Sequence, residues 1–470
     1  MSYKRPSSLI ALSRSYFPSV YPSVYLNTNN IITKMTVDAI QQKKTASPAA
    51  PGAAFYTPAQ VPAAGTPLDS TPGEVPTLFT PLKIRGVELQ NRFAVAPMCT
   101  YSADDGHMTD WHMVHLGSFA LRGVPLTIFE ATGVLPNGRI TPECSGLWQD
   151  SQIAPLKRIV DYIHTQGQKA GIQLAHAGRK ASTKAPWHYQ RGKSELAGPE
   201  EGGWPENVWA PSAICYNEET FPQPKEMTVE QIQELVEAWK AAAQRALKAG
   251  FDLIEIHAAH GYLISEFLSP ISNQRTDQYG GSFENRTRIL VEITKAIRSV
   301  IPKDMPLFVR VSATEWMEYT GQPSWDLQQT IELAKILPDL GVDLLDVSSG
   351  GNNKDQKINV HTYYQIDMAE EIRAAVHAAG KKLLVGAVGL VTSAEIAKET
   401  VQEKADGKVT ITRENGAKTR ADMVLVARQF LKEPEFVLTV ADELGVDVKA
   451  PVQYLRGPLS KRTKKLTTVP

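Results

Sequence analysis

Eight short runs of apolar and β-branched residues recur along the chain, separated by longer segments with helical periodicity. Three of the longer segments end at a glycine (Gly250, Gly341 and Gly380), as helices often do before a following strand. Strands that alternate with helices favour a parallel sheet, and eight such units predict a closed (β/α)8 TIM barrel. The runs are RFAVAP (92–97), PLTIFEAT (125–132), KAGIQLAH (169–176), DLIEIH (252–257), PLFVRVS (306–312), DLLDVSS (343–349), KLLVGAVG (382–389) and ADMVLVAR (421–428).

A doubly wound open sheet is the competing fold for such an alternation. That fold typically carries a glycine-rich fingerprint after its first strand, whereas the first run here continues as AVAPMCTYSADDG (94–106). The barrel is therefore the better prediction. Its expected helices include 151–166, 228–249, 283–300, 326–340 and 365–379.

Two insertions interrupt the expected barrel. Residues 180–226 follow the third strand, are rich in Trp and Pro, and predict a long loop that forms a rim or lid. Residues 401–420 precede the last strand, and their charged composition predicts an exposed hairpin without an assigned chemical role.

The ends of the chain differ in composition from the expected barrel. Residues 46–76 are rich in Pro and Ala, which is typical of a disordered segment or a wrapping arm. No acidic residue precedes Asp38, as in mitochondrial presequences, and an upstream extension ending before Met35 is the alternative. We therefore expect an N-terminal extension (1–76), a barrel (77–458) and a basic tail (459–470), in a cytoplasmic protein or, as the alternative, a mitochondrial one.

Charge and cysteine content narrow the function classes. Lys plus Arg and Asp plus Glu each total 50, so neither a nucleic acid nor a membrane surface is expected as a partner. Only three cysteines occur, which are too few for a disulfide framework or an iron–sulfur cluster.

Chemistry in a TIM barrel collects at the carboxyl ends of the strands. One such end carries two histidines and a tyrosine within six positions, in IEIHAAHGYLISEFLSP (254–270). This cluster leaves three alternatives open: a metal site, an acid/base pair, or two donors aimed at one substrate oxygen. Polar or small residues stand at nearly every expected strand end, namely Pro97-Met98-Cys99, Glu130-Ala131-Thr132, Gln173 with His176, His257 with His260 and Tyr262, Arg310, Ser348-Ser349-Gly350, Gly386 with Gly389, and Arg428.

One long motif, HAAHGYLISEFLSPISNQRTDQYGGSFENRTR (257–288), and three short ones resemble the old yellow enzyme family of flavin-dependent ene-reductases, in particular its thermophilic-like subgroup. The short motifs are APMCTY (96–101), GIQLAHAGRK (171–180) and PVQYLRGP (451–458). The resemblance implies a barrel that binds FMN non-covalently and takes hydride from NADPH, with NADH possible. It further implies ping-pong reduction of the C=C bond in α,β-unsaturated carbonyl or nitro compounds.

The resemblance also assigns flavin contacts. Arg310 would stabilise negative charge near N1 of the reduced ring, Gln173 would meet the pyrimidine-like edge, and Cys99 would tune the flavin potential. The last strand has Ala427 where the family usually has glycine, which puts flavin affinity in doubt rather than the binding mode. The implied flavin-binding residues are Ala96, Pro97, Met98, Cys99, Ala131, Gln173, Arg310, Ser349, Gly350, Gly386, Ala427 and Arg428.

On the substrate side, the resemblance implies that His257 and His260 hold the substrate oxygen and that Tyr262 protonates the α-carbon. A metal is disfavoured because the motif supplies only two ligands. Tyr101 would contact the substrate. Arg456 would reach the active site of a neighbouring subunit, which implies a homodimer or homotetramer.

Functions of other classes remain as alternatives. A dienoyl-CoA reductase-like barrel would need the missing cysteine cluster, and an RNA-modifying flavin barrel would need a basic groove. A non-catalytic flavin sensor or scaffold would not need His257, His260, Tyr262 and Arg310 together.

Overall fold

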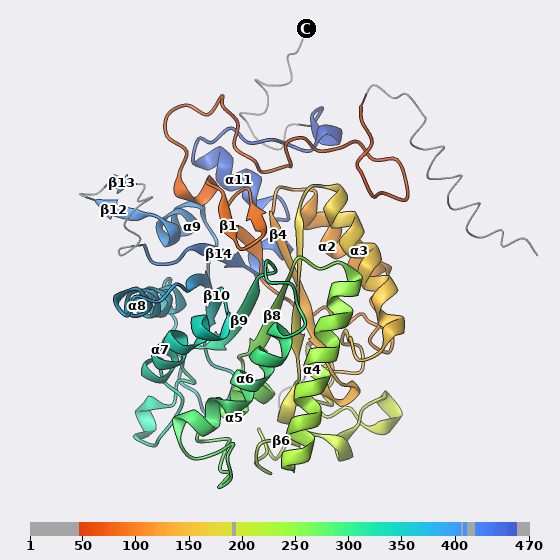
Figure 1. The fold of residues 1–470 in the computed structure, drawn as a ribbon, viewed down its shortest axis with the longest axis vertical. Helices are drawn as coiled ribbons and strands as arrows, with labels where there is room; N and C mark the ends of the chain where they lie inside the picture. Colours follow the sequence, from red (N-terminus) through yellow and green to blue (C-terminus); the bar gives the residue numbers. More distant parts are fainter. Residues whose placement is uncertain (1–46, 190–193, 406–407, 411–418, 458–470) are drawn as a thin grey trace, which may run out of the picture.

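Eight parallel strands close into a barrel in the computed structural model, which describes residues 47–189, 194–405, 408–410 and 419–457 (Figure 1). The strands follow chain order around the barrel, and the last pairs with the first. All eight coincide with the runs expected from the sequence, so the TIM barrel is confirmed. The strands are β3 (Phe93–Val95), β4 (Leu126–Gly133), β5 (Lys169–Ala175), β8 (Leu253–Ala258), β9 (Leu307–Ser312), β10 (Leu344–Ser348), β11 (Leu384–Val388) and β14 (Met423–Val426).

Helices cover the outside of the barrel, and the five expected ones are present. Thr228 and Ser282 accept hydrogen bonds from backbone N–H groups in the first turns of α4 and α6, so both helices begin where the sequence predicts. The segment expected at 326–340 is α-helical only to Ile336, and continues as a 3₁₀ turn that contains Pro338. The helices are α2 (Asp110–Ala120), α3 (Ile153–Thr165), α4 (Val229–Ala249), α5 (Leu263–Leu268), α6 (Phe283–Arg298), α7 (Leu327–Ile336), α8 (Tyr364–Ala378), α9 (Ala394–Val401), α10 (Arg428–Lys432) and α11 (Phe436–Glu443).

A hairpin of β1 (Leu82–Ile84) and β2 (Val87–Leu89) covers the amino end of the barrel. Its apolar side chains are buried with interior side chains such as Leu126, Leu253 and Phe308. A separate and larger apolar cluster fills the layer between strands and helices. The barrel is therefore a packed core at this end, and a functional site is expected at its carboxyl end.

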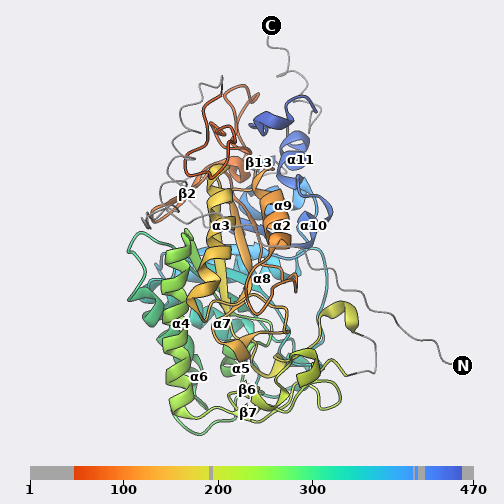
Figure 2. The same ribbon diagram turned by 90° about the vertical axis from the view of Figure 1, so that its right-hand side faces the viewer.

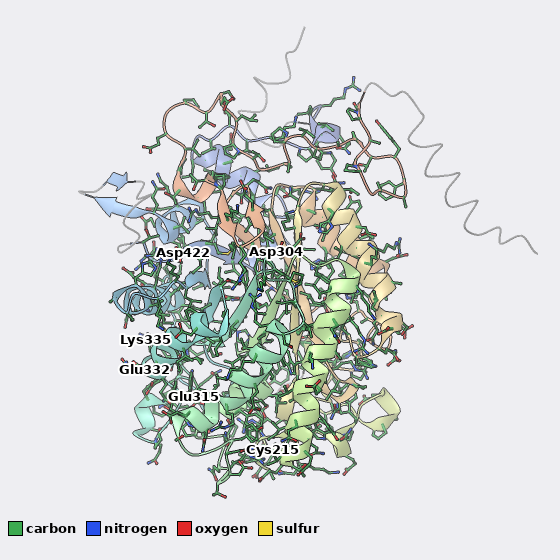
Figure 3. All side chains as sticks on the ribbon, viewed as in Figure 1. Cys215, Asp304, Glu315, Glu332, Lys335 and Asp422 are labelled. Atoms are coloured by element: carbon green, nitrogen blue, oxygen red, sulfur yellow. The ribbon has the colours of Figure 1, made fainter. Side chains whose placement is uncertain are left out.

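The two ends of the barrel lie at opposite ends of the molecule. In Figure 3, Asp422, which precedes β14, lies toward the end with β1, and Glu315, which follows β9, lies toward the end with β6. The expected long loop after the third strand is present at this carboxyl end. It contains short 3₁₀ turns and the two-residue strands β6 (Trp209–Ala210) and β7 (Lys225–Glu226) (Figure 2).

Residues 47–76 lie against the amino end of the barrel, as a wrapping arm would. Their backbone pairs with residues 447–449, near the C-terminal end of the described chain. The domain boundary at residue 77 stays a prediction, and residues 1–46 and 458–470 lie outside the described residues.

Part of the expected hairpin at 401–420 is described, as the antiparallel strands β12 (Glu403–Ala405) and β13 (Lys408–Thr410). Within the described ranges, no helix is long and apolar enough to cross a membrane.

Candidate active site

His257 lies near the end of β8, and the turn that follows carries His260 and packs tightly against the loop after β10. His260 has a φ of 62°, in the left-handed region that non-glycine residues seldom adopt. The next residue, Gly261, has a φ of 68°, and a Cβ there would lie 2.2 Å from the carbonyl oxygen of Gly351. This close contact holds His260 in place, and the backbone N–H of His260 also donates a hydrogen bond to Oγ of Ser312 (2.8 Å).

The rings of His257, His260 and Tyr262 meet at this turn. The ring centroid of His257 lies 5.2 Å from that of His260 and 5.1 Å from that of Tyr262. The backbone N–H of Ala259 donates to Nδ1 of His257 (3.3 Å), so a neutral His257 carries its proton on Nε2. Nε2 of His260 meets Oγ of Ser348 at 2.7 Å, which leaves Nδ1 of His260 for another partner.

Both histidines are neutral at physiological pH. Burial lowers the pKa of His257 and of His260 well below the ordinary value, and the nearby Arg310 and Lys180 cations lower both further. A neutral imidazole keeps one N–H that can donate to an oxygen. Among the described residues, no group of three or more His, Cys, Asp or Glu side chains is arranged to hold a metal ion.

Tyr262 and Tyr101 line a cavity of about 370 Å³ beneath the loop 180–226. Burial raises the pKa of each phenol well above its usual value, so both stay protonated at neutral pH. Tyr101 has a φ of 51° and contacts Trp187 of the loop, with ring centroids 5.7 Å apart. Neither His257 nor His260 lines this cavity, and Tyr262 connects it with the histidines.

Lys180 is a cavity residue for which the sequence predicted no role, although it closes the motif GIQLAHAGRK. Its ammonium donates to the carbonyl oxygens of His260 and Gly351 (2.9 Å each) and lies 5.0 Å from the ring centroid of Tyr262. Burial, with help from Arg179, lowers the pKa of Lys180 to about 8. The sequence did not indicate this contact, because the folded chain alone brings Lys180 to the turn after β8.

Glu315 is a second residue that the sequence did not indicate. Its buried carboxylate accepts from the Ser269 hydroxyl (2.8 Å), the Trp325 backbone N–H (2.6 Å) and the Asn352 amide (2.6 Å). It thereby joins the loops after β9 and β10 to the end of α5. This link fixes the loop against which the His260–Gly261 turn packs.

Arg310 lies inside the barrel among acidic side chains. Its Nε is 3.1 Å from Oδ2 of Asp346, and no hydrogen bond in the described part of the chain uses its two terminal nitrogens. Gln173 donates from Nε2 to Glu255 (2.8 Å), which leaves its amide oxygen as an acceptor. Burial and the nearby Asp346 raise the pKa of Glu255 above its usual value.

This interior cluster fits FMN. The free terminal N–H groups of the buried Arg310 suit the negative charge of a reduced flavin, and a free amide oxygen suits an imide N–H. A register shift in β4 between Phe129 and Thr132 also takes the Ala131 peptide out of the β4–β5 pairing. Such a bulge frees backbone groups to meet a ligand.

Cys99 is half-buried after β3, and burial holds its thiol pKa well above the usual value. The next residue, Thr100, donates from its N–H (3.2 Å) and its hydroxyl (2.7 Å) to Glu130. Glu130 therefore anchors the segment Ala96–Cys99 beside the β4 bulge.

The remaining residues expected to bind FMN stand at three neighbouring strands, β10, β11 and β14. Ser349 and Gly350 follow β10, Gly389 follows β11 with a φ of 112°, and Ala427 precedes α10, which begins at the exposed Arg428. The expectation that Gly386 stands at a strand end was wrong. It lies in the middle of β11, where a Cβ would be 2.4 Å from Leu425, so its lack of a side chain serves core packing.

Arg456 is not brought to this site. It is exposed, and the segment that carries it pairs with the arm at the amino end of the barrel, whereas His257 lies near the carboxyl end of β8.

Comparisons with known proteins match most of the chain. A family described as NADH:flavin oxidoreductase / NADH oxidase matches residues 77–446. An NADH:flavin oxidoreductase of Gibberella zeae is 49% identical over 409 residues, which are 85% of this chain and 93% of that protein. An NADPH dehydrogenase of Bacillus subtilis is 43% identical over 376 residues, 80% of this chain and 97% of that one. Morphinone reductase, a solved structure, has a TM-score of 0.60 and 27% identity, over 81% of this chain and 93% of that chain.

Proposed function

The chain belongs to the NADH:flavin oxidoreductase / NADH oxidase family, and we propose that it reduces the C=C bond of α,β-unsaturated carbonyl or nitro compounds. The family makes it an FMN-dependent oxidoreductase with NAD(P)H as the hydride donor, as its resemblance to the old yellow enzymes predicted. The alkene substrates, a preference for NADPH and a ping-pong order are parts of the proposal.

FMN, when bound, supplies a ring that accepts a hydride from the nicotinamide and donates it to an electrophilic alkene. In the proposal Arg310 stabilises the negative charge of the reduced ring, and Gln173 and the Ala131 peptide orient it. Ala96, Pro97, Met98 and Cys99 would lie along the ring. Ser349, Gly350 and Arg428, with the N–H of Ala427, would hold the phosphate.

The paired neutral imidazoles are the observation that carries the proposal. Because Nδ1 of His257 accepts from Ala259, its Nε2–H is a donor. If the Ser348 hydroxyl donates to Nε2 of His260, the proton of that ring is on Nδ1. Two N–H groups directed at one carbonyl or nitro oxygen polarise the C=C bond and stabilise the anion that forms after hydride addition.

Tyr262 is the proposed proton donor to the α-carbon. Its ring touches that of His257, it lines the cavity, and its raised pKa keeps the proton available. Tyr101, which lines the same cavity, would contact the substrate. The nearby Lys180 ammonium would stabilise the phenolate left after transfer.

Arg456 would complete the substrate site of a second copy. Because its segment is bound to the arm at the amino end of the barrel and its own histidines lie at the carboxyl end, the proposal requires a homodimer or a larger symmetric assembly such as a homotetramer.

The double variant His257→Ala/His260→Ala tests the proposal. We expect it to keep FMN, judged by flavin absorbance, and to lose cyclohex-2-enone reduction by ~10³-fold, since two oxyanion donors are removed. His361→Ala, at an exposed histidine, is the matched control. Enone turnover by the double variant at the rate of the control would refute the role of the pair. Stopped-flow reduction of bound FMN by NADPH in the unaltered protein excludes a non-catalytic scaffold.

A further inference from the structure

The N-terminal arm (residues 47–76) and the C-terminal segment (residues 447–457) both lie outside the family-matched region 77–446. They are also bound to each other. The N–H of Gly65 donates to the carbonyl oxygen of Lys449, and the N–H of Lys449 donates to the carbonyl oxygen of Thr66 (2.8 Å each). The N–H of Leu68 donates to the carbonyl oxygen of Asp447 (2.8 Å). The pairing is antiparallel, as in a short two-stranded ribbon.

The arm is in turn anchored to the barrel. Gln90 and Gln168 both donate from their amides to the carbonyl oxygen of Ala64 (3.1 Å each). Asn91 donates to the carbonyl oxygens of Gly65 (3.2 Å) and Gly123 (3.1 Å). A Cβ on Gly65 would lie 2.2 Å from the Gly123 oxygen, so the arm touches barrel backbone directly. Gln90, Asn91 and Gln168 precede β3 and β5, at the amino end of the barrel.

Gln60 ties down the last turn before Arg456. Its side-chain oxygen accepts from the N–H of Val452 (3.1 Å), and its amide donates to the side-chain oxygen of Gln453 (2.9 Å). Gln60 itself is buried, so water cannot readily replace its partners in these two hydrogen bonds. Thr57 adds a contact from the arm to the amide of Gln453 (3.4 Å).

Arg456 follows this tethered turn by two residues. Its side chain is exposed, and within the described residues no hydrogen bond or ion pair holds the guanidinium. The segment that carries it is therefore restrained up to Tyr454, while the charged group stays available at the surface.

We propose that the N-terminal arm, through Gln60, positions the C-terminal segment so that Arg456 is presented to the active site of a second copy. The inference rests on the proposed role of Arg456 and makes Gln60 a positioning residue. Without the bonds from Gln60, the residues that carry Arg456 would sample many conformations. Binding of a substrate by the Arg456 guanidinium would then include the entropic cost of ordering these residues.

A double-mutant cycle in the full-length, FMN-loaded protein tests this inference, with kcat and KM measured for cyclohex-2-enone. We expect Arg456→Ala to raise KM about tenfold, as for loss of a charge-assisted hydrogen bond. Gln60→Ala should raise KM about fivefold with little change in kcat, and the double variant should match Arg456→Ala alone.

Two further variants separate positioning from general damage to the fold. Gln60→Glu keeps the acceptor for the Val452 N–H and offers its second oxygen to the Gln453 amide once that amide has rotated, and should restore KM to nearly the original value. Tyr56→Phe removes an exposed bond within the arm, from the phenol to Ser47, and should leave KM unchanged.

The ways in which the inference can fail are distinguishable. If Gln60→Ala raises KM by the same factor in the Arg456→Ala variant as in the original protein, the arm affects KM independently of Arg456 and the inference is wrong. The same holds if Gln60→Ala leaves KM unchanged while Arg456→Ala raises it. If Arg456→Ala itself changes nothing, the role of Arg456 fails and this inference fails with it, although C=C reduction stands.

Discussion

Gly261→Ala tests whether contact between two loops holds the histidine turn in place. The φ of 68° costs an alanine about 1 kcal/mol. The added Cβ would also lie 2.2 Å from the Gly351 oxygen and 2.5 Å from the Asn352 Cα. Both are backbone atoms, so a loop must move, which costs about 1–3 kcal/mol more. We expect a total loss of about 2–4 kcal/mol in the free energy of unfolding.

Gly281→Ala is the matched control, because Gly281 has a φ of 80° but no atom lies within 4 Å of the position that an added methyl group would take. Gly281→Ala should lower the free energy of unfolding by only about 1 kcal/mol, the conformational cost of the positive φ. Urea unfolding of the FMN-loaded variants gives both free energies, and enone turnover reports the position of His260. Equal destabilisation of the two variants, with unchanged turnover in Gly261→Ala, would refute the idea that this contact positions the site.

Two further predictions concern proton transfer. Tyr262→Phe should slow reoxidation of the reduced flavin by an enone at least ~10²-fold and leave reduction by NADPH nearly unchanged, because only the reoxidation step needs the acid. Stopped-flow absorbance measures each step, and equal slowing of both would count against the role. Because the pKa of Lys180 is lowered to about 8, its ammonium is present below that pH and is lost as the pH rises through it. The kcat/KM for an enone should therefore fall above pH 8 in the unaltered protein, and Lys180→Met should lack that inflection; an unchanged profile in the variant would contradict this prediction.

Local patterns in the chain determined the elements of the barrel. Each strand coincides with an apolar run that can be recognised in the sequence. Residues that start helices, such as Thr228 and Ser282, accept hydrogen bonds from backbone N–H groups three residues later. The long motif at 257–288 also placed His257, His260 and Tyr262 together, because they lie within six positions of one turn. These features involve neighbours in the chain, so the sequence alone carries them.

Contacts between distant segments were decided only by the tertiary structure. The sequence placed Gly386 at a strand end, but its neighbour Leu425 comes from another strand and puts it in the core. Lys180 and Glu315 act on a turn and a loop far from them in sequence. The pairing of residues 65–68 with 447–449 joins the two ends of the described chain. No local propensity encodes such contacts, because their free energy arises only when packing brings the segments together.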